Sequence, residues 1–490
     1  MQCTAAWPQY SLAMGVSGSV ASRRGQRRGD GIRRRACAVL ALLALGAAAC
    51  HSAPPKPTDV IVVVVDTLRA DRLGRYGNPR GLTPTLDRLA DRGVRFAHAY
   101  APASWTMPSV ASLFTSRLPL QHQVRDFDSR LPDSEVTVAE RLSAAGVAAA
   151  GFTANWRLTA DLGYAQGFPT WRGFFNSPGS EKKARGEVLR TAALEWIDQK
   201  PAEGAPRPTR FLYLQYMEPH VPLEPPADLR ARFAPDLGPD DVARLNTWAL
   251  MLHPGREALA PDDVTRIAAL YDSEVAAVDV EIDRLFQALE QRGVLEHALV
   301  IVTADHGEEI LEHGTFGHGS NLFNTTVHVP LIVAGPGIPA GRVVEENVSL
   351  IDLAPTLLDV LGLKPEARFE GRSLLPLLRG ATATSPAAPV DVILQLPHKG
   401  GDLDLRAHRD GLVRGAEKLL VGVEGVGERF DLATDPGEQH PTTLPADAPL
   451  RTALDAATAA LAARQQPAEE KAAVDDATKE KLRALGYATD

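Results

Sequence analysis

The stretch Asp59-Val60-Ile61-Val62-Val63-Val64-Val65-Asp66 is a run of β-branched residues that ends in a carboxylate. A second apolar run, residues 298–304, leads into Asp305-His306-Gly307. Continuous apolar runs of this length are typical of strands buried on both faces of a parallel sheet. Because ligands of such sheets bind beyond the carboxyl ends of the strands, we expect Asp66, Asp305 and His306 to converge on one crevice.

Strand-like and helix-like segments alternate along the rest of the body, which predicts a doubly wound α/β sheet. The expected strands are 60–65, 94–99, 147–152, 210–216, 298–304 and 329–334. The expected helices are 84–92, 108–116, 137–145, 183–198, 262–292 and 351–361. We expect a main domain over 59–385, a smaller unit over 386–440, and an Ala-rich, charged, helical tail over 441–490.

Thr106 precedes Pro108 by two residues, ahead of a short apolar helix. Proline suits the first turn of a helix, so this hydroxyl is expected where free N–H groups and the helix dipole favour an anionic ester. A plain threonine N-cap explains this segment alone equally well. Two carboxylates, an imidazole and a hydroxyl together favour a divalent cation, Mn²⁺ or Zn²⁺ rather than Ca²⁺. The alternative makes Asp66 and Asp305 caps or turn residues.

The first 50 residues resemble an export signal. Seven arginines precede an apolar stretch, 36–49, whose 14 residues are too short for a comfortable membrane-spanning helix. Cys50 follows three alanines, as in a bacterial lipoprotein signal. We therefore expect a lipidated Cys50, a Pro-rich tether over 51–58 and a location on the periplasmic side of the envelope. An ordinary signal peptide is the alternative.

The net charge limits the expected partners, and the positions of the cysteines limit the expected disulfides. The formal net charge is −9, and the signal contributes +6, so the remainder carries −15. Such a chain is not expected to bind nucleic acid, and any anionic substrate needs local positive groups. The cysteines are Cys3, Cys37 and Cys50, so the body contains no disulfide and core burial must hold it together.

The order of motifs resembles that of the sulfatase family, within the alkaline phosphatase superfamily. The resemblance runs from about Val60 to the C-terminus. The motifs are residues 65–77, 83–90, the Thr106 loop, 216–223, 303–308, 316–320, 348–358, 430–438 and 485–487. This resemblance implies an alkaline-phosphatase-like, mainly parallel sheet flanked by helices, with a smaller C-terminal α+β subdomain.

The resemblance also implies roles. The metal ligands would be Asp66, Thr106, Asp305 and His306, with Thr106 also acting as the nucleophile on a small-molecule or glycan anionic ester. His220 would be a leaving-group acid or an oxyanion contact, and His318 a substrate contact where many relatives carry lysine. The side chain of Asn155 would point into the crevice, and His313 would be structural.

Departures from the family pattern change the expected chemistry. Thr106 replaces the cysteine or serine that relatives oxidise to formylglycine, and Val110 replaces an arginine. Thr67 replaces a second aspartate. The family's Gly-Lys-x-His motif is missing, and Asn155-Trp156-Arg157 is the stretch most similar to it. We therefore expect no formylglycine, and instead an arylsulfatase-like hydrolase of sulfate or phosphate esters with unmodified threonine. The alternatives are a phospho-group transferase acting on envelope glycan or lipid, and a non-catalytic binding lipoprotein.

Overall fold

The computed structural model describes residues 56–175, 183–201, 203–250, 259–380, 390–396, 408–465 and 467. All of them belong to the unit Pro55–Asp490. The expected signal, Cys50 and residues 51–55 of the expected tether lie outside this part. Within the described ranges, no helix is both long and apolar enough to cross a membrane.

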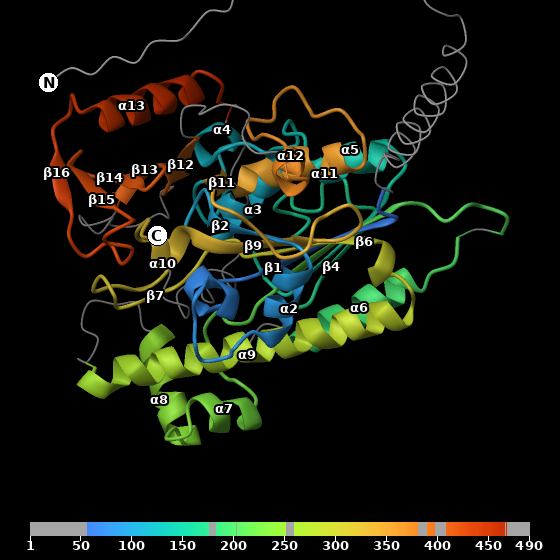
Figure 1. The fold of residues 1–490 in the computed structure, drawn as a ribbon, viewed down its shortest axis with the longest axis horizontal. Helices are drawn as coiled ribbons and strands as arrows, with labels where there is room; N and C mark the ends of the chain where they lie inside the picture. The colour runs from blue at the N-terminus through green and yellow to red at the C-terminus, as the bar shows by residue number, and fades with distance from the viewer. Residues whose placement is uncertain are drawn as a thin grey trace, which may run out of the picture. The chain divides into compact units, whose positions relative to one another are not determined.

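The valine run is the centre of a nine-stranded sheet in the described part of the chain (Figure 1). The strands are β1 (Asp59–Val65), β2 (Val94–Tyr100), β3 (Ala148–Thr153), β4 (Thr170–Gly173), β5 (Arg210–Tyr216), β6 (Ala298–Thr303), β9 (His328–Ala334), β10 (Arg342–Val344) and β11 (Val348–Ser349). Their order is β10-β2-β9-β6-β1-β5-β3-β4, and β11 pairs with β2. Strand β1 is parallel to both neighbours, whereas β9 runs antiparallel to β2 and β6. The predicted fold class is confirmed.

Helices cover both faces of this sheet, and a further helix packs against the second, C-terminal sheet. They are α2 (Pro84–Arg92), α3 (Thr106–Thr115), α4 (Pro119–His122), α5 (Val138–Ala144), α6 (Gly186–Ile197), α7 (Ala227–Phe233), α8 (Pro239–Leu250), α9 (Pro261–Gln291), α10 (Asn324–Val327), α11 (Leu353–Val360), α12 (Leu375–Leu378) and α13 (Pro449–Ala462). The long helix α9 contacts α2, α6, α7 and α8 on one face, and α3 contacts α4, α5 and α11 on the other (Figure 1). This double cover buries the whole of β1, as its unbroken apolar sequence predicts.

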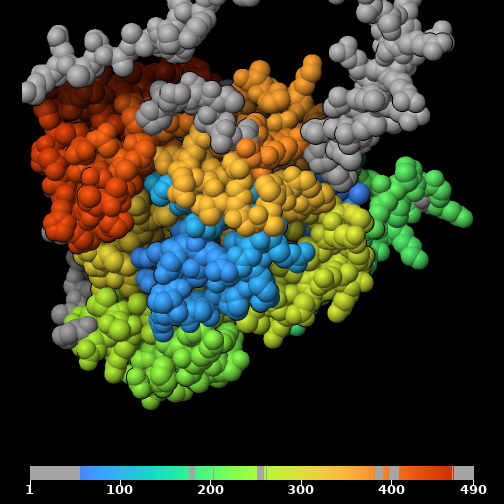
Figure 2. Space-filling model, viewed as in Figure 1, coloured from blue at the N-terminus to red at the C-terminus, as the bar shows by residue number. Residues whose placement is uncertain are grey.

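A second, antiparallel sheet follows in the C-terminal part. Its strands, in order, are β12 (Asp391–Gln395), β13 (His408–Arg414), β14 (Glu417–Gly422), β15 (Gly427–Asp431) and β16 (Thr442–Leu444). Helix α13 packs against β13. A hairpin of β7 (Glu309–Ile310) and β8 (Phe316–Gly317) follows β6 in the chain. In Figure 2 the orange-to-red surface of the C-terminal sheet adjoins the olive-yellow surface of the segment that contains this hairpin.

Candidate active site

Two parallel strands bring the predicted carboxylates to one edge of the sheet. Asp66 directly follows β1, and Asp305 and His306 follow β6, with Val64 paired to Thr303. All three side chains are fully buried, and their ligand atoms lie within 4.8 Å of one another. The Nε2 atom of His306 lies 3.6 Å from Asp66 Oδ1 and 3.5 Å from Asp305 Oδ2. The strand ends therefore converge as expected.

Thr106 joins this group from the first residue of α3. Its Oγ1 lies 3.2 Å from His306 Nε2. Asn155, just after β3, donates from Nδ2 to Asp66 Oδ2 at 2.6 Å and to Thr106 Oγ1 at 3.3 Å. We call Asp66, Thr106, Asp305 and His306 the strand-end site.

The N-cap interpretation of Thr106 is wrong. The expected helix 108–116 starts two residues earlier, so Thr106 has helical geometry and Trp105 occupies the cap position without a capping hydrogen bond. The threonine hydroxyl is therefore directed to the strand-end site rather than used to cap the helix. Pro108 still lies within the first turn, where its missing N–H costs no hydrogen bond.

Negative charge is crowded in the strand-end site. Burial raises the pKa of Asp66 well above its ordinary value, and the neighbouring Asp305 raises it further, against His306 and the hydrogen bond from Asn155. Burial also raises the pKa of Asp305 to about 7, although it accepts hydrogen bonds from Thr106 and from backbone groups. Two buried carboxylates at this distance favour a bound proton or a bound cation.

The donor set fits a divalent cation. Asp66 Oδ1 is buried and accepts no hydrogen bond. The ring of His306 contacts the carbonyl of Gly307 through Nδ1 at 2.9 Å. Because a carbonyl only accepts, Nδ1 carries the proton, and Nε2 is the ring nitrogen that can bind a metal beside the two carboxylates. The strand-end site thus offers two oxygens, one nitrogen and one hydroxyl to a metal.

His220 and His318 extend the site as a row of rings. The ring of His318 lies 4.5 Å from that of His306 and 5.0 Å from that of His220. His318 Nδ1 contacts Glu308 Oε1 at 2.8 Å. Burial, with a further contribution from His318, lowers the pKa of His220 to about 3. A neutral and a carboxylate-paired imidazole therefore lie side by side.

The sulfatase family model matches residues 58–363. The chain belongs to the sulfatase family. It is 30% identical to human arylsulfatase A over 375 residues, which cover 70% of this chain and 71% of the relative. It is 25% identical to a delta 4,5-hexuronate-2-O-sulfatase of Bacteroides thetaiotaomicron, covering 82% and 87% of the two chains. The fold is shared with the phosphonate monoester hydrolase of Agrobacterium radiobacter, at a TM-score of 0.66, 24% identity and coverage of 84% and 96%.

This sulfatase-family site contains supporting residues that the motif analysis missed. Gln215 in β5 donates to Asp305 Oδ2 at 3.2 Å, and Ser109 in α3 donates to the Asp305 carbonyl at 2.6 Å. Glu308 holds His318. Gln215 carried a readable signal, because it is an amide inside an otherwise apolar or aromatic stretch, 211–216. Ser109 gave no such signal, because its partner lies 196 residues away and is a backbone carbonyl. Glu308 pairs with a residue only ten positions away, across the β7–β8 hairpin.

The turn after Asp66 holds an unusual backbone geometry. Thr67 adopts a φ of +60°, a left-handed conformation that a β-branched residue avoids. Its carbonyl accepts a hydrogen bond from the Tyr271 hydroxyl at 2.5 Å, and the same hydroxyl accepts one from the Arg69 N–H at 3.2 Å. Strain of this kind costs of order 1–3 kcal/mol and persists only when its surroundings fix it. Tyr271 of α9 thus helps to hold the end of β1.

Proposed function

We propose that this sulfatase-family chain is a metal-dependent hydrolase of sulfate or phosphate esters in which unmodified Thr106 is the nucleophile. The observation that carries the proposal is the 3.2 Å contact between Thr106 Oγ1 and His306 Nε2 inside a buried carboxylate pair. A bound cation would lower the pKa of the hydroxyl and offset negative charge on the ester. The imidazole and hydroxyl among the donors favour Mn²⁺ or Zn²⁺ over Ca²⁺.

In the first step, the Thr106 hydroxyl loses its proton to solvent and its oxygen attacks the sulfur or phosphorus atom. The bond from that atom to the leaving oxygen breaks, and a threonine ester remains. His318 is the better proton donor to the leaving oxygen, because its contact with the Glu308 carboxylate stabilises the imidazolium. Asn155 Nδ2 helps to position the nucleophile.

In the second step, water cleaves the threonine ester and releases sulfate or phosphate. His220 would accept a hydrogen bond from that water, and the proton would pass to solvent. Its Nδ1 contacts the Val221 carbonyl at 2.6 Å, so the neutral ring keeps Nε2 as an acceptor. The two histidines would then have different roles: His318 as acid and substrate contact, and His220 as a neutral hydrogen-bond acceptor that orients the water.

The names of relatives support the proposed substrate class. Named relatives include an arylsulfatase and a hexuronate sulfatase, which supports a small-molecule or glycan anionic ester. We also propose a lipid anchor at Cys50 on the periplasmic side of the envelope.

Turnover assays test this proposal. The full chain is incubated with aryl sulfate, phosphomonoester, phosphodiester and phosphonate monoester probes, each with Mn²⁺, Zn²⁺ or Ca²⁺. We expect Thr106→Ala to lower kcat by about 10³-fold or more, Thr106→Ser to retain turnover, and an intact mass with no change at Thr106. Unchanged turnover in Thr106→Ala would refute the role of the hydroxyl. Product analysis with water as the one acceptor excludes the transferase.

A further inference from the structure

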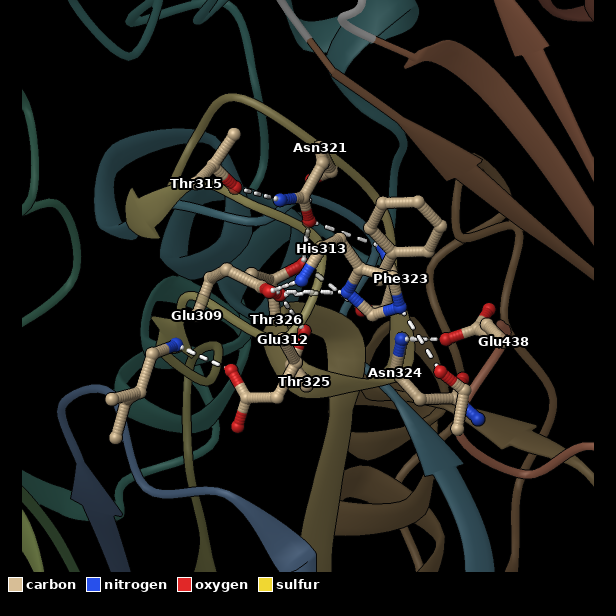
Figure 3. Close-up of polar contacts among 12 residues, drawn as sticks. Glu309, Glu312, His313, Thr315, Asn321, Phe323, Asn324, Thr325, Thr326 and Glu438 are labelled. Carbon is tan, nitrogen blue, oxygen red and sulfur yellow. Dashed lines mark hydrogen bonds and ion pairs between the residues drawn. The ribbon is translucent and has the colours of Figure 1, made fainter. Parts of the chain in front are cut away.

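His313 lies between β7 and β8, and both nitrogens of its ring face acceptors (Figure 3). Its Nδ1 lies 3.1 and 3.2 Å from the two carboxylate oxygens of Glu309. Its Nε2 lies 3.0 Å from the carbonyl of Gly437, which follows β15 of the C-terminal sheet. The ring stacks on Phe323, with 3.6 Å between centroids and 11° between planes. We call His313, Glu309, Gly437 and Phe323 the clasp.

The hydrogen bonds of the clasp define its protonation. The Glu309 carboxylate accepts hydrogen bonds from the backbone N–H of His313 at 2.6 Å and from the Thr325 hydroxyl. With Glu309 ionised and saturated by donors, the ring must donate to it from Nδ1. The Gly437 carbonyl has no hydrogen to give, so Nε2 must donate as well. The ring is therefore an imidazolium, and its stacking on Phe323 adds a favourable cation–π contact.

A neighbouring pair holds the same two segments together. Glu438 forms an ion pair with Lys418 of β14 at 2.6 Å and accepts a hydrogen bond from the Asn324 N–H. Both charged side chains are almost completely buried. Lys418 also donates to Asn324 Oδ1 at 2.9 Å. Gln439 Nε2 also donates to the Glu312 carbonyl at 3.4 Å, so the turn 435–440 is joined to the segment 306–324 at three points, one of which depends on His313.

We propose that His313 is a positioning residue whose doubly protonated ring fastens the segment 306–324, which carries His306 and His318, to the C-terminal sheet. The catalytic consequence rests on the proposed function, whereas the clasp itself does not. When the ring is neutral, one of its two hydrogen bonds is lost. The segment then gains freedom, and His306 binds a metal less tightly.

Charged groups around the ring support this state. Burial alone disfavours the imidazolium, but Glu309, the Gly437 carbonyl and Glu438 together raise the pKa of His313 above its ordinary value. The cation of the neighbouring pair, Lys418, is neutralised by Glu438. Glu312 on the same segment is paired with Arg69. The clasp therefore stabilises the fold below the ordinary pKa of histidine, and this contribution is lost as pH rises through the raised value.

The test begins with the wild-type full chain. Its histidines are labelled with ¹⁵N, and the ring shifts are followed from pH 5 to 10 in a chelator. We expect both nitrogens of His313 to be protonated at pH 7. A neutral ring at that pH would overturn the proposal without any variant. This measurement is independent of ester hydrolysis, so an inactive enzyme would not affect it.

Two variants then test the positioning role. His313→Gln is compared with His440→Gln, which alters an exposed histidine on the same C-terminal turn. At pH 7 we expect His313→Gln to increase hydrogen exchange in peptides of 306–324 and 435–440, and to weaken Mn²⁺ binding by about tenfold. His440→Gln should leave both unchanged. If His313→Gln kept the hydrogen-exchange rates and the Mn²⁺ affinity of the wild type, the positioning role of His313 would be refuted. A Glu309→Gln/His313→Gln double variant that adds no further loss confirms that the two residues act as one unit.

Discussion

The strand-end site and the clasp each place a histidine next to a buried carboxylate. They differ in whether the carboxylate oxygens accept hydrogen bonds. In the strand-end site, Asp66 Oδ1 has no donor, and burial raises the pKa values of Asp66 and Asp305. In the clasp, donors satisfy both oxygens of Glu309 and, against the effect of burial, lower its pKa. We therefore expect the strand-end site to bind a cation. The clasp requires no ligand, because hydrogen-bond donors already satisfy its carboxylate. The same residue types therefore indicate a binding site in one place and a structural joint in the other.

The largest difference between the two clusters is expected in metal affinity. Asp305→Asn should weaken Mn²⁺ binding by more than about 100-fold, because outer residues of metal sites alone account for 10- to 100-fold. Calorimetric titration of the chelator-treated full chain measures this loss. Glu309→Gln should weaken binding by no more than about tenfold. Equal losses in the two variants would contradict the assignment of one cluster to the metal and the other to structure.

The second difference is the sign of the effect on stability without metal. Glu309→Gln should lower the free energy of unfolding by about 2–3 kcal/mol, because it removes the buried charge that the partly buried His313 ring faces. Asp66→Asn should raise it by about 1 kcal/mol, since it removes a buried charge whose pKa the fold raises. Denaturant unfolding in a chelator compares both variants with the wild type. If Asp66→Asn instead lowered the free energy of unfolding, the Asp66 charge would stabilise the metal-free fold, and this prediction would be wrong.

The sequence predicted the strand-end site better than the clasp for a physical reason. Asp66 and Asp305 each end a long apolar run, and parallel strands place such ends at one edge. Their meeting needed no knowledge of loops. The predicted strands were found because buried central strands have the strongest pattern, but the antiparallel direction of β9 leaves no mark in its composition. Strand direction depends on the path of the preceding chain.

His313 illustrates what a single chain read from end to end does not reveal. Its sequence motif favoured a structural role, and its contact with Glu309 spans four residues. Its other partner, Gly437, lies 124 residues away and contributes only a carbonyl. A backbone acceptor has no residue-type signature, so no motif could predict it. Gln215 is different. An amide side chain inside a buried strand requires a hydrogen-bond partner, so its residue type indicates a polar contact before the partner is known.

The smallest expected difference is in the pH dependence of stability. The pKa of Asp305 is raised to about 7 in the folded chain. Between about pH 4 and pH 7 the metal-free fold therefore binds more protons than the unfolded chain, and its stability falls as pH rises. The free energy of unfolding, measured in a chelator at pH 6 and at pH 7.5, should differ between the two pH values by about 1 kcal/mol less in Asp305→Asn than in wild type. Removal of the Asp305 charge also takes away one of the causes that raise the pKa of Asp66, which acts in the same direction. Asp305→Asn should reduce this difference by the same amount in a Glu309→Gln background, because Glu309 acts on the titration of His313 and not on that of Asp305. If the effect of Asp305→Asn disappeared in that background, the two clusters would titrate as one, and the contrast between them would fail.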